Sequence, residues 1–259
     1  MSFDLHDYPL LPIFLVSLVA VLAASEIGRR IGVRIGTRGE DDVSTLEGAI
    51  LGLLALMVGF TFAMALSHFD ARRDAVLNEA NAIGTTALRA RLLPAPHSNE
   101  SLKLLREYVQ IRLDVTQGTP TQMELSAAIE RSNAIQEALW QQAAKVSAND
   151  NGMVPTGIFI QALNEMIDNQ EKRLTALRNR LPNIVLIALY GVTVIAAAFT
   201  GYASGLEARR SRLPVYIMGM LVSTVILLIQ DLDRPDAGFI KVSQQPMIDT
   251  AASIAAFTD

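Results

Sequence analysis

The chain has 259 residues and a formal net charge of −4 at pH 7, a balance that gives no sign of a nucleic-acid partner. It contains no cysteine, which excludes disulfides and cysteine metal sites, and its three histidines are scattered rather than clustered. Hydrophobic residues make up 51% of the chain, and they are strongly segregated along it.

Four long apolar runs lie two and two around a polar middle. They cover residues 9–27, 46–67, 183–203 and 213–230. A helix needs about 20 residues to cross the ~30 Å hydrocarbon core of a bilayer, so each run is long enough, or nearly so, to span a membrane. The leader before the first run carries Asp4 and Asp7 and no basic residue, unlike a signal peptide, so we expect this run to be retained as a helix.

The runs predict an all-α polytopic membrane protein. Transmembrane helices 1 and 2 fall within residues 1–67, and helices 3 and 4 fall within residues 182–230. A helical-bundle extramembrane domain occupies residues 68–181 between the two pairs, and a C-terminal tail covers residues 231–259. Strand patterns, phosphate-binding loops and hydrolase or metalloprotease motifs are missing, so we predict that the protein is not an enzyme.

Small residues recur along one face of the second apolar run. They are Gly48, Gly52, Ala55, Gly59 and Ala63. Small side chains let helix backbones approach each other closely in lipid, where packing drives helix association. The pattern predicts a helix-packing seam, either with another helix of the same chain or with another subunit.

The second membrane helix is expected to continue into the polar middle, because residues 67–93 contain no proline and one glycine. This continuation carries a polar stripe, with Asn78, Asn81 and Thr85 along one face and Glu79 beside it. The stripe suits either an ion vestibule or hydrogen-bonded contacts within the bundle. Further soluble helices are predicted to begin near Thr121 and Pro155 and at Ser98, which would act as an N-cap.

The basic residues of the loops indicate on which side of the membrane the middle domain lies. Seven arginines lie in the two short loops after helices 1 and 3, and the positive-inside rule puts such loops in the cytoplasm. That places the middle domain outside the cytoplasm. Basic residues also flank the membrane on the other side, among them Arg72, Arg73 and Lys172, but the short loops weigh more in the rule.

Three aspartates follow the fourth apolar run, at positions 231, 233 and 236. Carboxylate oxygens are calcium ligands, although this spacing differs from that of an EF-hand loop. The alternative, which the mismatch favours, is a helix stop held by ion pairs. The exits of helices 2 and 4 share one side of the membrane, so we predict that Arg72 or Arg73 pairs with Asp231 or Asp233. A weak calcium site, if present, would be formed by Asp231, Asp233 and Asp236.

A pair of acids lies at the short-loop ends of the first two helices. Arg29 and Arg30 follow Glu26 by three and four residues, which favours ordinary local ion pairing. The sequence Ser44-Thr45-Leu46-Glu47 resembles an N-cap with an acid in the first turn, which predicts a helix start there, and Glu47 suits such a helix N-terminus.

Several of these motifs resemble those of the bestrophin-like domain family of bacterial membrane proteins. The matching stretches are residues 53–65 with a Gly-Phe-Thr-Phe core, the pair Arg72-Arg73, residues 78–85 and residues 231–238. The resemblance covers nearly the whole chain and extends, more distantly, to bestrophins, which are pentameric, calcium-regulated anion channels. It implies a multi-pass protein of the bacterial inner membrane, with the lipid bilayer, copies of itself and inorganic ions as partners. It also implies a cytosolic middle domain, against the arginine count, so the side of this domain stays open.

On this basis we expect a homo-oligomeric ion channel, with five subunits if it follows bestrophins, whose second helices line the pore. The candidates near the pore constriction are Phe60, Thr61, Met64 and Ser67. The alternative is a non-conducting membrane scaffold or sensor whose helical domain binds a protein partner. A channel should place its small-residue face between subunits and a polar path along its axis, whereas a scaffold needs neither.

Overall fold

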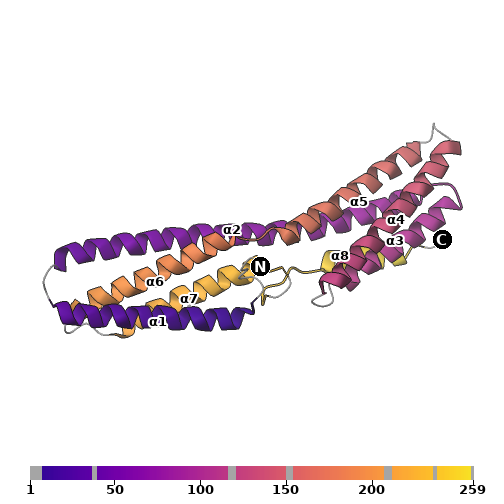
Figure 1. Ribbon diagram of the computed structural model, residues 1–259. Helices are drawn as coiled ribbons and strands as arrows, with labels where there is room; N and C mark the ends of the chain where they lie inside the picture. Colours follow the sequence, from indigo (N-terminus) through magenta and orange to yellow (C-terminus); the bar gives the residue numbers. More distant parts are fainter. Residues whose placement is uncertain are drawn as a thin grey trace. The chain divides into compact units, whose positions relative to one another are not determined.

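The computed structural model describes residues 8–36, 40–115, 121–149, 154–206, 212–235 and 238–257, and all regular structure within these ranges is helical (Figure 1). The helices are α1 (Leu10–Ile35), α2 (Glu40–Ala90), α3 (His97–Asp114), α4 (Gln122–Asn149), α5 (Val154–Arg178), α6 (Asn183–Leu206), α7 (Leu213–Asp233) and α8 (Gln245–Ala255). Four helical stretches in the described residues are long and apolar enough to cross a membrane. The predicted all-α membrane fold is confirmed.

The chain divides into two compact units. The first comprises Met1–Phe69 and Arg180–Ile240, and it contains α1, α6, α7 and the apolar part of α2. The second comprises Asp70–Asn179 and Lys241–Asp259, and it contains the polar part of α2 together with α3, α4, α5 and α8. The predicted C-terminal tail is therefore divided between the two units, because its first ten residues belong to the first unit and α8 belongs to the second.

Helix α2 is continuous from Glu40 to Ala90, which confirms the prediction that the second membrane helix continues beyond the apolar run. Its expected start near Ser44 and Thr45 is wrong, because the helix begins at Glu40, and Glu47 therefore lies about two turns inside the helix and not at its N-terminus. Acidic residues are favourable in the first turn of a helix, where they face the positive end of the helix dipole, and no proline stops the helix from extending upstream.

The tightest helix pair in the first unit is α1 with α6, whose backbones touch. A Cβ atom added to Gly28 would overlap the carbonyl oxygen of Ala198, and one added to Gly201 would overlap that of Ser25. Gly32 and Gly205, one turn further along each helix, are equally close to the opposite backbone. Two Gly-x-x-x-Gly motifs thus interlock, as expected where small residues let membrane helices approach.

The inner face of α2 packs on α6 and α7. Leu54 and Ala65 lie in one buried apolar cluster with Leu189 of α6 and Ile226 and Ile229 of α7. Each of these side chains has less than a tenth of its surface exposed, so this side of α2 is committed to packing within the unit. The opposite side of α2 is left outward.

The second unit has its own apolar core. Ile83 of α2, Leu105 of α3, Leu139 of α4 and Phe159 of α5 are fully buried within it, and Met247 anchors α8 against the same cluster. Helix α3 begins at His97, and the backbone N–H groups of His97 and Ser98 both bond to the carbonyl oxygen of Pro94. Ser98 is therefore inside the first turn, and its predicted role as an N-cap is wrong.

Candidate functional site

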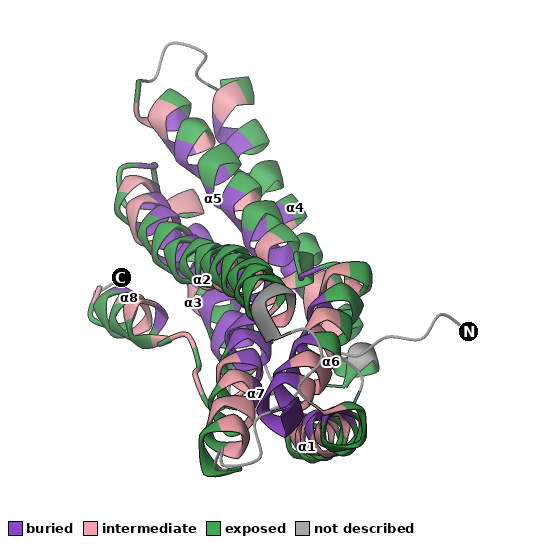
Figure 2. Ribbon diagram, turned by 90° about the vertical axis from the view of Figure 1, so that its left-hand side faces the viewer, coloured by how far each residue is buried: buried purple, intermediate pink, exposed green. Residues whose placement is uncertain are grey.

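The small residues of the predicted seam lie on the outward side of α2, among larger exposed side chains such as Leu53 and Leu56. All five, Gly48, Gly52, Ala55, Gly59 and Ala63, are exposed, and Figure 2 shows much of α2 in the green of exposed residues. A Cβ atom added to Gly48, Gly52 or Gly59 would meet no heavy atom of the described residues within 4 Å. No described helix of the chain packs closely on the glycines of the seam, and the close backbone contact is made by the glycines of α1 and α6 instead.

Three of the four pore candidates share this outward face. Phe60 is 65% exposed and Met64 is 42% exposed, and Ser67 is also exposed, at the helical spacing of four and then three residues. Thr61 differs, because it is 3% exposed and its hydroxyl donates a hydrogen bond to the carbonyl oxygen of Met57 at 2.6 Å. Its side chain belongs to the inner side of α2, and the involvement of all four residues in a pore stays a prediction.

A buried carboxylate lies where α7 ends. Asp233 is fully buried, and one of its oxygens lies 2.9 Å from Nδ1 of His68, at the end of the apolar part of α2. Its other oxygen accepts a hydrogen bond of 2.8 Å from the backbone N–H of Leu181. Asp233 thus ties α2, α7 and the segment before α6 together within the first unit.

Asp231 closes the turn that follows α7. Its carboxylate accepts hydrogen bonds from the backbone N–H groups of Phe239, at 2.6 Å, and of Ile240, at 2.9 Å. Gly238 lies against the same carboxylate, because a Cβ there would come within 2.9 Å of Asp231. The spacing from Asp231 to Gly238 is explained by these contacts, through which the aspartate holds the segment that follows α7.

The other predictions for the aspartate segment stay open. Asp236 lies outside the described residues, and no group of three or more potential metal ligands occurs among those that are described. Arg72 is buried and Arg73 is exposed, and both belong to the second unit, so their pairing with Asp231 or Asp233 stays a prediction. Calcium binding stays a prediction as well.

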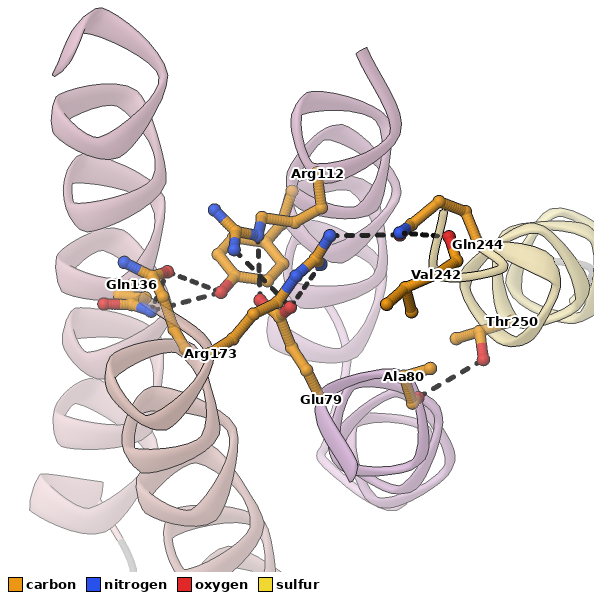
Figure 3. A network of polar contacts seen from close by, with 10 residues as sticks. Glu79, Ala80, Arg112, Gln136, Arg173, Val242, Gln244 and Thr250 are labelled. Carbon is orange, nitrogen blue, oxygen red and sulfur yellow. Dashed lines mark hydrogen bonds and ion pairs between the residues drawn. The ribbon is translucent and has the colours of Figure 1, made fainter. Parts of the chain in front are cut away.

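The polar stripe of α2 divides between the outside and the core of the second unit. Asn78 and Asn81 are exposed and Thr85 is half-buried, whereas Glu79 has no exposed surface. One Glu79 oxygen lies 2.8 Å from Nε of Arg112 on α3, and the other accepts a hydrogen bond of 2.6 Å from Nη1 of Arg173 on α5 (Figure 3). Glu79 therefore serves contacts within the bundle, which was one of the two interpretations of the stripe.

The Glu79 cluster extends through neutral polar side chains that are also buried. Tyr108 donates to Oε1 of Gln170 at 2.6 Å, and Gln136 donates to the same oxygen at 2.8 Å. Burial, together with the negative charge of Glu79, raises the pKa of Tyr108, so the phenol keeps its proton and remains a donor. On the opposite side, Arg173 donates to Gln244, the residue before α8, at 3.0 Å.

The two arginines were missed at the sequence level, although a signal for them existed. Arg112 follows Leu105 and Val109 by seven and three residues, and Arg173 follows Met166 by seven. Each arginine is thus in phase with apolar core positions of its helix, where a charged residue is rare unless it is paired. An arginine in phase with a core stripe predicts a buried acidic partner, which Glu79 supplies.

Four membrane-spanning helical stretches and a separate helical unit, with α2 shared between the two, define a multi-pass helical membrane protein. A model of the Bestrophin-like domain matches residues 14–247, and the chain belongs to this family. The fold is that of a solved bacterial Bestrophin homolog from Klebsiella pneumoniae, with a TM-score of 0.66, 14% sequence identity and 95% of each chain covered. A second crystal structure, described as a membrane protein, gives a TM-score of 0.65 at 16% identity and covers 93% of this chain and 95% of its own. No curated protein sequence matches the chain.

Proposed function

We propose that this protein is a homo-oligomeric ion channel of the bacterial plasma membrane, with α2 lining the pore. The observation that carries the proposal is the outward side of α2, where the exposed small residues of the seam lie beside Phe60, Met64 and Ser67. An apolar helix with an open small-residue face is suited to close contact with another helix, because its backbone is accessible. Membership of the Bestrophin-like family supports a channel, and on that ground we propose anions as the conducted ions.

The side chains on this face suggest how a pore would restrict ions. Phe60 and Met64 are large and apolar, and a ring of such residues can close a pore by excluding water from it. Ser67, one turn further along, offers a hydroxyl at the end of the apolar part of α2. No charged side chain lies between Gly48 and Ser67, so the face itself carries no fixed charge to select an ion.

Cysteine accessibility tests the proposal, because the native chain has no cysteine and each single-cysteine variant is therefore unambiguous. The purified full-length variant Ser67→Cys is placed in liposomes, and chloride and potassium fluxes are measured separately before and after a charged thiol reagent. Val16→Cys on α1, which is 70% exposed, is the matched control for modification of an outward membrane position. We expect chloride flux that the reagent reduces strongly in Ser67→Cys and leaves unchanged in Val16→Cys.

The opposite results would refute the proposed function. Equal effects of the reagent on both variants would show that α2 does not line the pore. No flux of either ion, with and without Ca²⁺ and across several pH values, would favour the non-conducting scaffold or sensor. The arms with and without Ca²⁺ also test whether calcium acts on this chain.

A further inference from the structure

An apolar groove runs between α1 and α7 on the outside of the first unit. It has a volume of about 380 Å³ and is lined by Leu18, Leu22, Leu213, Tyr216, Ile217 and Met220. This volume falls within the range of ~300–1,000 Å³ that is typical of ligand sites. The four α7 residues follow one another at helical spacing from the start of the helix, so the groove extends inward from the short-loop end of the membrane span.

Two basic side chains lie near the short-loop end of this groove. Arg212 directly precedes Leu213 and is exposed, and the side chain of Arg30 is 71% exposed. Glu26 lies at the same end, where it accepts hydrogen bonds of 3.0 Å from Nε of Arg30 and 3.0 Å from the hydroxyl of Tyr216. Arg212 is also close enough to attract the negative charge of Glu26.

Among the described residues nearest this end of the groove, positive charges outnumber negative ones. Arg30 and Arg212 contribute two positive charges against the single negative charge of Glu26. Arg29 and Arg34 add positive charge in the last turns of α1. Arg30 is held in position by Glu26 while most of its side chain faces outward, which leaves guanidinium N–H groups accessible to an anion.

We propose that this groove binds one phospholipid with an anionic head group. One acyl chain lies along the apolar residues between α1 and α7, and the head-group phosphate lies against Arg30 and Arg212. Basic pockets at the ends of membrane helices attract anionic lipids, and tyrosine is suited to the level of the head groups. The groove and the arginines together fit a ligand that is apolar at one end and negatively charged at the other.

The same features disfavour a helix of a second subunit as the occupant. An apolar helix would fill the groove, but it would also cover Arg30 and Arg212, which share the single carboxylate of Glu26, without supplying a second negative charge. Removing a charged side chain from water without a partner is costly, whereas a lipid phosphate supplies that partner. The positive charge at the short-loop end of the groove therefore favours an anionic lipid over an apolar helix as the occupant.

Native mass spectrometry of the full-length protein tests the proposal, after equilibration with equal amounts of phosphatidylglycerol and phosphatidylcholine. We expect phosphatidylglycerol to be retained preferentially. Arg212→Gln and Arg30→Gln should each weaken its retention about fivefold, since a basic residue near an anionic lipid surface contributes ~1 kcal/mol. Arg73→Gln, which removes the same charge at an exposed position of the second unit, should leave retention unchanged.

Two further arms separate a lipid from a simple anion. Ile217→Trp narrows the groove and should release phosphatidylglycerol, whereas Val16→Trp, on α1 but away from the groove, should not. Inorganic phosphate and glycerol 3-phosphate at millimolar concentration should fail to displace the lipid, because they lack the acyl chain. Displacement by either, equal retention of both lipids, or full retention in both arginine variants would overturn the proposal.

Discussion

Removal of the negative charge of Glu79 tests whether the buried cluster holds the second unit together. Glu79→Gln preserves the size of the side chain but leaves Arg112 and Arg173 buried without a counter-charge. Removing one partner of a buried ion pair costs about 3–5 kcal/mol, because the remaining charge cannot recover its hydration. Whole domains are stable by about 5–15 kcal/mol, so the substitution should remove a large part of the stability of the unit.

The chain supplies its own probe for this measurement. Its single tryptophan, Trp140, lies on α4 within the second unit, so the tryptophan fluorescence of the detergent-solubilised protein reports the unfolding of that unit. At about 3 °C per kcal/mol for a unit of this size, we expect Glu79→Gln to lower Tm by roughly 10–15 °C.

Glu107→Gln is the matched control for this experiment. Glu107 lies 3.7 Å from Arg131, and the two side chains are 54% and 65% exposed. An exposed pair of this kind contributes about 0–1 kcal/mol, so the control should move Tm by no more than about 3 °C. A shift in Glu79→Gln no larger than that of Glu107→Gln would refute the reasoning.

A second substitution distinguishes loss of charge balance from loss of packing. Arg112→Met, added to Glu79→Gln, removes one of the two uncompensated charges and keeps an apolar side chain of similar length. Residues in one buried network commonly show coupling of about 0.5–3 kcal/mol, so the double variant should be more stable than the sum of the single effects predicts. Strict additivity would show that the charges of Glu79 and Arg112 do not act on each other.

Three further predictions concern other parts of the chain. Gly28→Ala should destabilise the first unit by about 1–3 kcal/mol, because the added methyl group meets the backbone of α6. Gly191→Ala is the control, because Gly191 has open space around it and the substitution should not destabilise the unit. Thermal unfolding compares the two variants. Hydrogen bonds from the backbone and side chain of Thr121 lower the pKa of Glu124, so the added stability of the α4 start should be present above the ordinary carboxyl pKa and lost as pH falls through the lowered value. Hydrogen exchange should therefore show less protection there at pH 3 than at pH 5, and Glu124→Gln should remove the difference. The cysteine of Asn99→Cys, exposed on the second unit, should react with a membrane-impermeant maleimide in intact cells if the positive-inside rule holds, and only after lysis if the unit is cytosolic.

Several features of this protein were determined by the sequence alone, because they depend on local properties of the chain. The four membrane spans follow from the length and hydropathy of single segments, which the bilayer requires of any spanning helix. The continuity of α2 follows from the absence of helix-breaking residues after Ser67. The local pair of Glu26 with Arg30 follows from their separation by four residues, and the structure places Arg30 Nε 3.0 Å from Glu26.

Only the tertiary structure decided which partner each interacting residue has. Small residues occur on α1, α2 and α6, and the sequence does not state that those of α1 and α6 touch while those of α2 remain outward. In the sequence, Glu79 is one polar residue of a stripe, and only the packing of α3 and α5 brings Arg112 and Arg173 to it. Asp231 is one of three aspartates, and only the fold places backbone N–H groups of the segment after α7 at its carboxylate. Such contacts join residues far apart in the chain, and their energy depends on which helix faces pack together, so no local pattern contains them.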